Sequence, residues 1–264
     1  MALLSNTIDE AITKDDIVAK LKTLGIKPNM VLETHMALSA FGYVVGGAQA
    51  VVDALILALG YDGTLVMPMQ DANNCDPSIW DSPPIDHSLH QLVRDHTPAF
   101  HRKESDGVLM GAIADNFRRR DGVIVSNNPS LAYAAWGKYA KLICDRQPLH
   151  FSLGEDSPIA RMYDLDASVL MIGAPFSKCT CLHLAEYRSQ YRPIVLQGAA
   201  VEINGRREWK KYLDVDLNSQ IFNEVATEMV NEIPISTIMI GKAEAKLFKM
   251  KDAIEFTIKY LKAK

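Results

Sequence analysis

Residues 30–69, MVLETHMALSAFGYVVGGAQAVVDALILALGYDGTLVMPM, decide the fold class of this chain. Two short apolar runs, 30–34 and 63–69, are typical of buried strands. Between them a strongly apolar helical pattern begins at Gly46-Gly47 and stops at Gly60. Strands and helices continue to alternate along the chain, and this order predicts an α/β sheet with helices on both faces.

The flanking sequence extends the same pattern. Thr13, followed by Lys14, Asp15 and Asp16, is typical of a capped helix start, and that helix should end at Gly25. Further strands are expected at 122–126, 168–174 and 193–203, and helical patterns at 87–96, 109–120, 218–232 and from Asp252 onward. The Asn-Gly pair in NGRRE (204–208) predicts a hairpin after the 193–203 strand, and this hairpin suggests an antiparallel portion and hence a mixed sheet. Residues 234–250 are also hairpin-like. No linker interrupts residues 1–264, which predicts a single domain.

Composition excludes several classes of function. The 264 residues are 48% hydrophobic and carry a formal charge of -4, which provides no electrostatic basis for binding nucleic acid or an anionic membrane. The first residues, MALLSNTIDEAITKDD, lack the basic and apolar regions of a signal peptide, and no apolar run is long enough to span a membrane. Four cysteines in a chain of this length predict a reducing, cytoplasmic setting.

Ligands of open α/β sheets bind beyond the carboxyl ends of the strands. This rule directs attention to His35, to the Asp-, Asn- and Pro-rich loop 69–84, to Ser126-Asn127 and to residues 174–186.

The last of these segments includes most of KCTCLHLAEYRSQYRP (178–193), which is open to several interpretations. Cys179, Cys181 and His183 could form a metal clip, although zinc sites usually space their cysteines more widely and need a fourth ligand. Either cysteine could be a nucleophile with His183 as its base. Alternatively, His183 is itself a general base, because Glu186 would lie one helical turn away on the same face. An ordinary surface His-Glu pair explains the spacing equally well.

The Gly46-Gly47 pair is a weaker signal. Glycines before a helix expose backbone amides that bind a pyrophosphate, but close helix packing also requires them. The chain has neither GxxxxGK[ST] nor GxGxxG, so it carries neither common nucleotide fingerprint.

Taken together, ordered segments from residue 13 to about 260 resemble the aminoglycoside 3-N-acetyltransferase family, and among its members the shorter bacillus-type ones. The segments that carry the resemblance are THMALSAFGYVVGGAQAVVDAL, GTLVMPM with DPSIWDSPP, TPAF, MGAIADNFR, SNNPSLAYAAWG, SLGEDSPIARMYDLDASVLMIGA and TCLHLAEYR. The resemblance implies the family's own α/β fold, distinct from the acetyltransferase superfold with a Gly-rich loop. It also implies acetyl transfer from acetyl coenzyme A to the 3-amine of 2-deoxystreptamine antibiotics, and hence resistance.

The resemblance also assigns roles to residues. His183 in T-x-L-H-x-x-E matches the base that deprotonates the attacking amine, with Thr180 and Glu186 as its partners. The coenzyme arm should contact residues that match the family's H-x-S-L-S segment and its glycine turn, together with one serine downstream: His35, Ala37, Leu38, Ser39, Gly46, Gly47 and Ser126. No metal is implied. The acceptor is a polycation, for which Asp71, Asp81, Asp115 and Asn128 are the expected contacts.

Several of these positions depart from the family pattern. Val125 and Asn128 stand where R-S-x-H-P has arginine and histidine, Ala132 and Ala37 replace serines, and Asp115 replaces glutamate. These changes leave two alternatives open: transfer to a different amine metabolite, or a binding protein whose catalysis has decayed. A homodimer is compatible with the apolar residues of the last helices but is not required by them.

Overall fold

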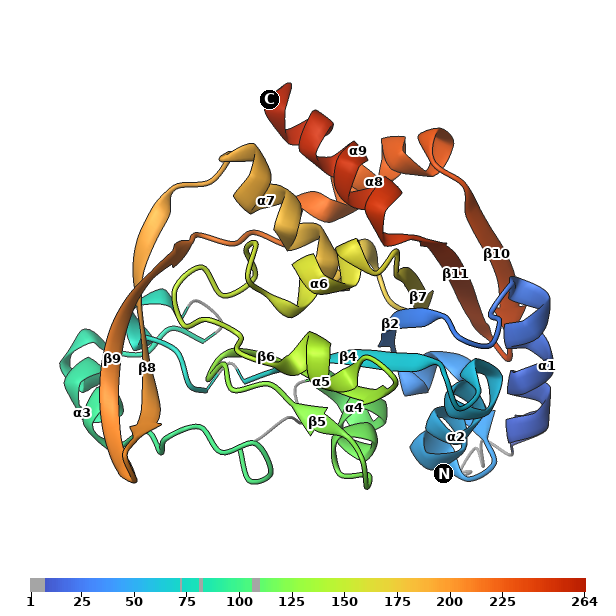
Figure 1. Cartoon of the computed structure of the whole chain (residues 1–264), viewed down its shortest axis with the longest axis horizontal. Coiled ribbons are helices and arrows are strands. Elements are labelled where there is room, and N and C mark those ends of the chain that lie inside the picture. Colours follow the sequence, from blue (N-terminus) through green and yellow to red (C-terminus); the bar gives the residue numbers. More distant parts are fainter. Residues whose placement is uncertain (1–7, 72, 81–82, 106–109) are drawn as a thin grey trace, which may run out of the picture.

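A seven-stranded mixed sheet organises the chain, in the order β10-β11-β7-β2-β4-β6-β5 (Figure 1). The structure is a computed structural model, and it describes residues 8–71, 73–80, 83–105 and 110–264. The strands of the sheet are β2 (Val31–Met36), β4 (Thr64–Gln70), β5 (Ile124–Val125), β6 (Leu131–Gly137), β7 (Ser168–Ile172), β10 (Ile235–Ile240) and β11 (Ala243–Lys249). In the centre, β2 pairs in parallel with both β4 and β7, and the outer pairings are antiparallel.

Helices cover both faces of this sheet, as the sequence predicts (Figure 1). One core lies under α1 (Lys14–Leu24), α2 (Gly47–Leu59) and α4 (Gly111–Arg118). The second core lies under α5 (Ala140–Cys144), α6 (Pro158–Asp164), α7 (His183–Ser189), α8 (Ile221–Glu232) and α9 (Met250–Lys262). Within the described residues, no helix has both the length and the apolar character to cross a membrane.

The expected capping signals are present. Thr13 and Asp16 form a reciprocal capping box at the start of α1, and Gly25 ends the helix in a left-handed conformation. Gly46, with a φ of 84°, is the N-cap of α2, and Gly60 follows its last turn.

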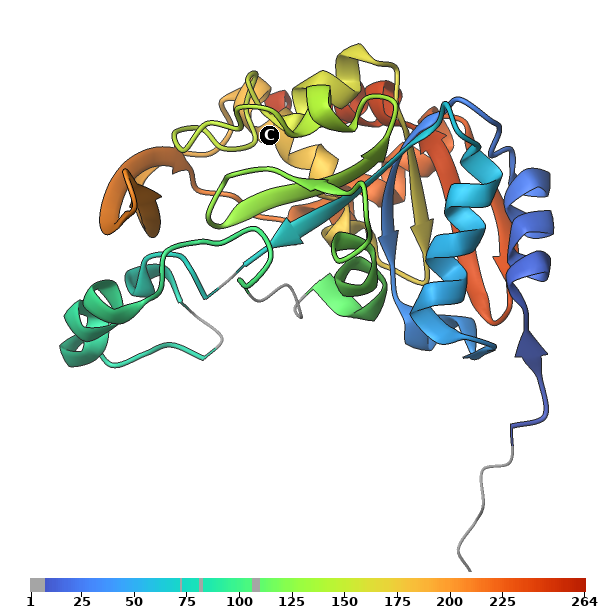
Figure 2. The same ribbon diagram turned by 60° about the horizontal axis from the view of Figure 1, so that its bottom comes forward.

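The prediction that the hairpin after residue 193 supplies the antiparallel part of the sheet was wrong. Residues 193–203 do form a hairpin, β8 (Ile194–Ile203) with β9 (Arg206–Val215), but the hairpin is a separate two-stranded ribbon. It lies beside α3 (His90–His96) at one end of the molecule (Figures 1 and 2). The amide of Asn74 exchanges two hydrogen bonds with the backbone of Ala200, so a loop rather than the sheet edge holds this ribbon.

The antiparallel strands of the sheet are β10 and β11, which form the hairpin expected at 234–250, together with β5 and β6. Strand β6 escaped prediction because LAYAAWG is rich in alanine, which has a low strand propensity. A short parallel pair, β1 (Ala11–Ile12) with β3 (Tyr43–Val44), completes the strands of the described residues.

Gly137 generates a prediction about stability. It ends β6 with a φ of 102°, and a Cβ there would lie 2.0 Å from the carbonyl oxygen of Gly63. Gly137→Ala should therefore disrupt the β4–β6 pairing and lower the free energy of unfolding by about 3 kcal/mol or more, measured by urea denaturation.

Gly205→Ala is the matched control. Gly205 also has a positive φ, 74°, but a Cβ there would meet nothing within 4 Å. In the control, the free energy of unfolding should fall only by the cost of placing a residue with a Cβ in the left-handed conformation, about 1–2 kcal/mol. Equal losses for the two variants would contradict the steric argument.

Candidate active site

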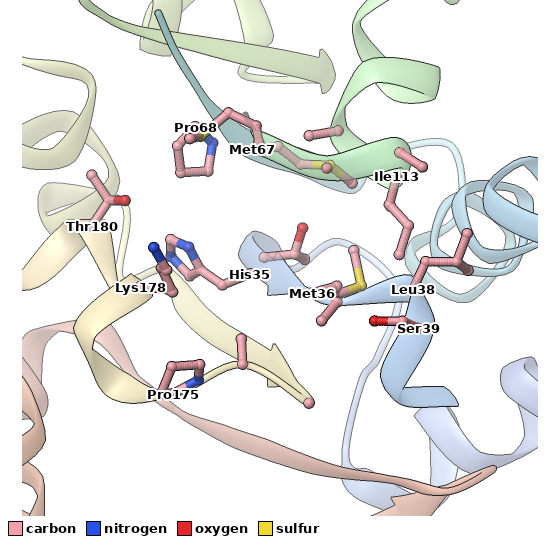
Figure 3. A pocket seen from close by; sticks show the side chains of 18 of the residues that line it. His35, Met36, Leu38, Ser39, Met67, Pro68, Ile113, Pro175, Lys178 and Thr180 are labelled. Atoms are coloured by element: carbon pink, nitrogen blue, oxygen red, sulfur yellow. The ribbon is translucent and has the colours of Figure 1, made fainter. Parts of the chain in front are cut away.

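A cavity of about 870 Å³ opens beyond the carboxyl ends of the central parallel strands. Its walls come from the chain after β2, the end of β4, the start of α4 and the segment that follows β7, and include Ala37, Leu38, Pro68, Ile113, Pro175 and Thr180 (Figure 3). This volume is within the range of small-molecule sites, and the location follows the rule for ligands of open α/β sheets.

His183 begins α7 and lines this cavity. Its Nδ1 lies 2.5 Å from Oε2 of Glu186, one helical turn further on, and both residues are buried. Glu186 is anchored in turn, because its Oε1 accepts a hydrogen bond of 3.0 Å from the backbone N–H of Asn218. A carboxylate at Nδ1 fixes the proton there and leaves Nε2 as the acceptor.

Local packing holds the histidine ring in place. Phe222 of α8 contacts it edge to face, with 4.9 Å between ring centroids. Thr180 lies on the short turn before α7 and also lines the cavity. His183 and Glu186 therefore form a buried pair, and the alternative of a surface His-Glu pair does not hold.

The two neighbouring cysteines are core residues. Cys179 and Cys181 are fully buried, their sulfurs lie 3.6 Å apart, and neither lines the cavity. Burial raises the pKa of the Cys181 thiol well above its ordinary value, which disfavours a thiolate nucleophile. The part of the chain that the structure describes contains no group of three or more His, Cys, Asp or Glu side chains that could hold a metal ion.

A second histidine also faces the cavity. His35 lies in β2, and its Nε2 is 3.5 Å from Oε1 of Glu33 on the same strand. Figure 3 shows the His35 ring on the side of the cavity that also carries Lys178 and Thr180. Glu33 was not among the residues singled out from the sequence, although a single charge within the apolar run MVLET was the signal that could have identified it.

The expected coenzyme contacts fall into two groups. His35, Ala37, Leu38, Ser39 and Gly47 all line the cavity, and Gly46 caps the helix directly behind Gly47. Ser126 does not line it: the hydroxyl is buried, donates to Gln147 and accepts from the N–H of Tyr133.

The amino terminus of α2, which the Gly46-Gly47 pair suggested as an anion site, lines the cavity, and the amino-terminal turn of α4, which the sequence did not suggest, lines it too. Neither helix has a side-chain cap. Their N–H groups can therefore bind an anion. Lys178 also lines the cavity and is exposed.

The residues expected to contact the acceptor are dispersed. Asp71 is buried and accepts the N–H of Asn73, while Asp115 pairs with Arg118 and Arg119 on α4. Asn128 is buried and holds a turn through the N–H groups of Ser130 and Leu131 and the carbonyl of Pro148. None of the three lines the cavity, and Asp81 lies outside the described residues.

Comparison with known proteins places the chain in a family. The sequence profile of aminoglycoside 3-N-acetyltransferase matches residues 34–262. One relative is the SPbeta prophage-derived aminoglycoside N(3')-acetyltransferase-like protein YokD of Bacillus subtilis, 37% identical over 94% of this chain and 92% of that protein. Aminoglycoside N(3)-acetyltransferase VIII of Streptomyces fradiae is 29% identical over 96% of this chain and 93% of its own length.

Solved structures agree with the sequence matches. The crystal structure of YokD superposes with a TM-score of 0.92 at 36% identity, covering 95% of this chain and 93% of that one. Aminoglycoside acetyltransferase AAC(3)-Xa superposes with a TM-score of 0.87 at 31% identity, covering 96% and 94% of the two chains. With a cavity beyond the central strands and matches along nearly its whole length, the chain belongs to the aminoglycoside 3-N-acetyltransferase family of acyltransferases.

Proposed function

We propose that this protein transfers the acetyl group of acetyl coenzyme A to the 3-amino group of 2-deoxystreptamine aminoglycosides, with His183 as the general base. The observation that carries the proposal is the buried pair of His183 and Glu186 at the wall of a cavity large enough for a coenzyme arm. The names of the relatives support the acceptor, and resistance to these antibiotics follows from their modification.

A base is needed because the neutral amine that attacks must also lose a proton to become an amide nitrogen. Nε2 of His183 takes the proton of the amine as nitrogen attacks the thioester carbonyl, and Glu186 stabilises the imidazolium that results. Thr180 lines the same cavity as His183, and its hydroxyl is the proposed donor to the oxyanion that develops. The transfer is direct, since Cys179 and Cys181 are buried away from the cavity.

The coenzyme would lie along the wall made by residues after β2. Ala37, Leu38 and Ser39 supply apolar surface and backbone groups for the pantetheine arm. The uncapped amino termini of α2 and α4 and the ammonium group of Lys178 supply positive potential for its phosphates.

One observation favours an amine other than an aminoglycoside as a second candidate acceptor. Within the described residues, the cavity lining contains no Asp or Glu, although a polycationic acceptor needs carboxylate partners. Asp71 and Asp115 are engaged elsewhere in the structure. A panel of aminoglycosides and simple polyamines, with thiol release from acetyl coenzyme A as the readout, distinguishes the two acceptor classes. A cytoplasmic location is part of this proposal, and the homodimer stays a prediction.

His183→Ala tests the proposed base. We expect kcat to fall by about 10²–10⁴-fold, since that is the usual contribution of a positioned general base. The affinity for coenzyme A, measured by calorimetry, should stay within about threefold of the wild-type value, because the base contacts the acceptor amine rather than the phosphates.

His87→Ala is the control, because His87 lies on the exposed turn before α3 and does not line the cavity. It should keep the wild-type rate. Full turnover by the His183 variant would exclude the base role, and binding of coenzyme A without turnover by the wild type would favour a decayed enzyme.

Lys178→Gln tests the phosphate contact. The KM for acetyl coenzyme A should rise about three- to tenfold with little change in kcat, because an exposed charge-assisted contact is partly screened. Lys141→Gln, an exposed lysine of α5, is the control. An unchanged KM at low ionic strength would remove Lys178 from the coenzyme site.

A further inference from the structure

Glu33 is a charged residue in the middle of the central strand, and the base mechanism gives it no role. Its side chain is fully buried. Oε1 accepts a hydrogen bond of 3.0 Å from the hydroxyl of Tyr133 on β6, whereas Oε2 has no hydrogen-bond partner in the part of the chain that the structure describes. A buried carboxylate with so few partners is costly unless a positive charge lies beside it.

His35 is the neighbour that can carry this charge. Among the described residues it is the one basic side chain within ion-pair distance of Glu33, with 3.5 Å between Nε2 and Oε1. The other titratable groups that face the carboxylate are Tyr133 from β6 and Cys181 from the turn before α7. Burial raises the pKa of Tyr133 and of Cys181 well above the ordinary values, so neither supplies a charge near neutral pH.

The ring of His35 has two different environments. Nε2 is shut away from solvent on the side of Glu33, and no hydrogen bond engages it. The residue nevertheless lines the cavity, so Nδ1 is the nitrogen left to meet a ligand. A carboxylate at Nε2 keeps one proton there and stabilises a second proton on Nδ1. The imidazolium then presents an N–H to the cavity.

His183 has the opposite arrangement. Its carboxylate partner sits at Nδ1 and shares its charge with the backbone N–H of Asn218. The cavity therefore holds two imidazoles, each with a buried carboxylate beside the ring nitrogen that faces away from the cavity. With His183 assigned as the base, His35 is the second imidazole that could exchange a proton with the substrates.

We propose that His35 is the general acid of the transfer and that Glu33 is the positioning residue that keeps it protonated; this inference rests on the proposed acetyl transfer. As the amine forms its bond to the carbonyl carbon, His183 takes a proton from nitrogen. The carbon–sulfur bond then breaks, and Nδ1 of His35 delivers a proton to the departing sulfur of coenzyme A. His183 thus gains one proton and His35 loses one. Before the next cycle, His183 must release its proton to solvent and His35 must take one up.

A change of leaving group tests this role. Glu33→Gln and His35→Gln should lower kcat with acetyl coenzyme A by about 10–100-fold, with KM for that substrate within about threefold. The oxygen-ester analogue of acetyl coenzyme A releases an alkoxide, which depends more on a proton donor than a thiolate does. Both variants should therefore lose at least about tenfold more with the ester than with the thioester. Equal losses on the two substrates, or losses confined to KM, would overturn the proposal.

Two controls separate this result from general damage. Thr64→Val removes a buried hydroxyl from β4, where it accepts the N–H of Tyr139 opposite the amino end of β2. This variant should lower the free energy of unfolding without changing the ratio of kcat on the oxygen ester to kcat on the thioester. Glu33→Asp keeps the negative charge, so its ratio of kcat on the oxygen ester to kcat on the thioester should lie between the values for the wild type and for Glu33→Gln.

Nuclear magnetic resonance provides a readout that needs no turnover. In spectra of nitrogen-15-labelled protein at neutral pH, one of the seven histidines should carry protons on both ring nitrogens, and its signals should vanish in His35→Gln and become those of a neutral ring in Glu33→Gln. A neutral His35 in the wild type would overturn the proposal. Absence of wild-type turnover with every amine would instead overturn the acetyl transfer and this role with it.

Discussion

The parallel pairing of β2 with both β4 and β7 is the constraint on which the rest of the structure depends. Parallel neighbours end at the same edge of a sheet, so the chain that follows each of these strands must arrive at one place. There the segment after β2, the end of β4 and the segment after β7 enclose a single cavity. The antiparallel strands outside this trio widen the sheet without adding further ends to the cavity.

Burial of polar groups at that edge has a free-energy cost that the structure offsets locally. Glu186 is held by His183 and by a backbone N–H, and Glu33 by His35 and Tyr133. Each carboxylate is thus matched to an imidazole, which is the arrangement that makes a buried charge tolerable. The same two imidazoles line the cavity, so the groups that stabilise the buried carboxylates also face the candidate ligand site.

The β8–β9 ribbon and α3 form a separate end of the molecule (Figure 2). Arg207 of β9 donates to the carbonyl oxygen of Thr97, and Asn74 binds the backbone of Ala200, so this end is joined to the 71–100 segment by polar contacts. Hydrogen bonds from Arg94 and Ser78 outweigh the effect of burial and lower the pKa of Asp76 to about 2, which keeps the carboxylate charged in the same region.

Much of this protein was already determined by its sequence. Apolar runs at 30–34 and 63–69 with a capped helical pattern between them predicted the α/β sheet, because such periodicity reflects local burial. The spacing of His183 and Glu186 likewise placed the two side chains on one helical face. Tertiary structure alone decided that this pair is buried, that Ser126 and Asn128 turn inward to hold the backbone, and that the 193–203 hairpin leaves the sheet. It also brought Tyr133 to Glu33, a contact across 100 positions of sequence. Contacts between residues this far apart in sequence depend on how the strands are ordered in the sheet, and no local pattern encodes that order.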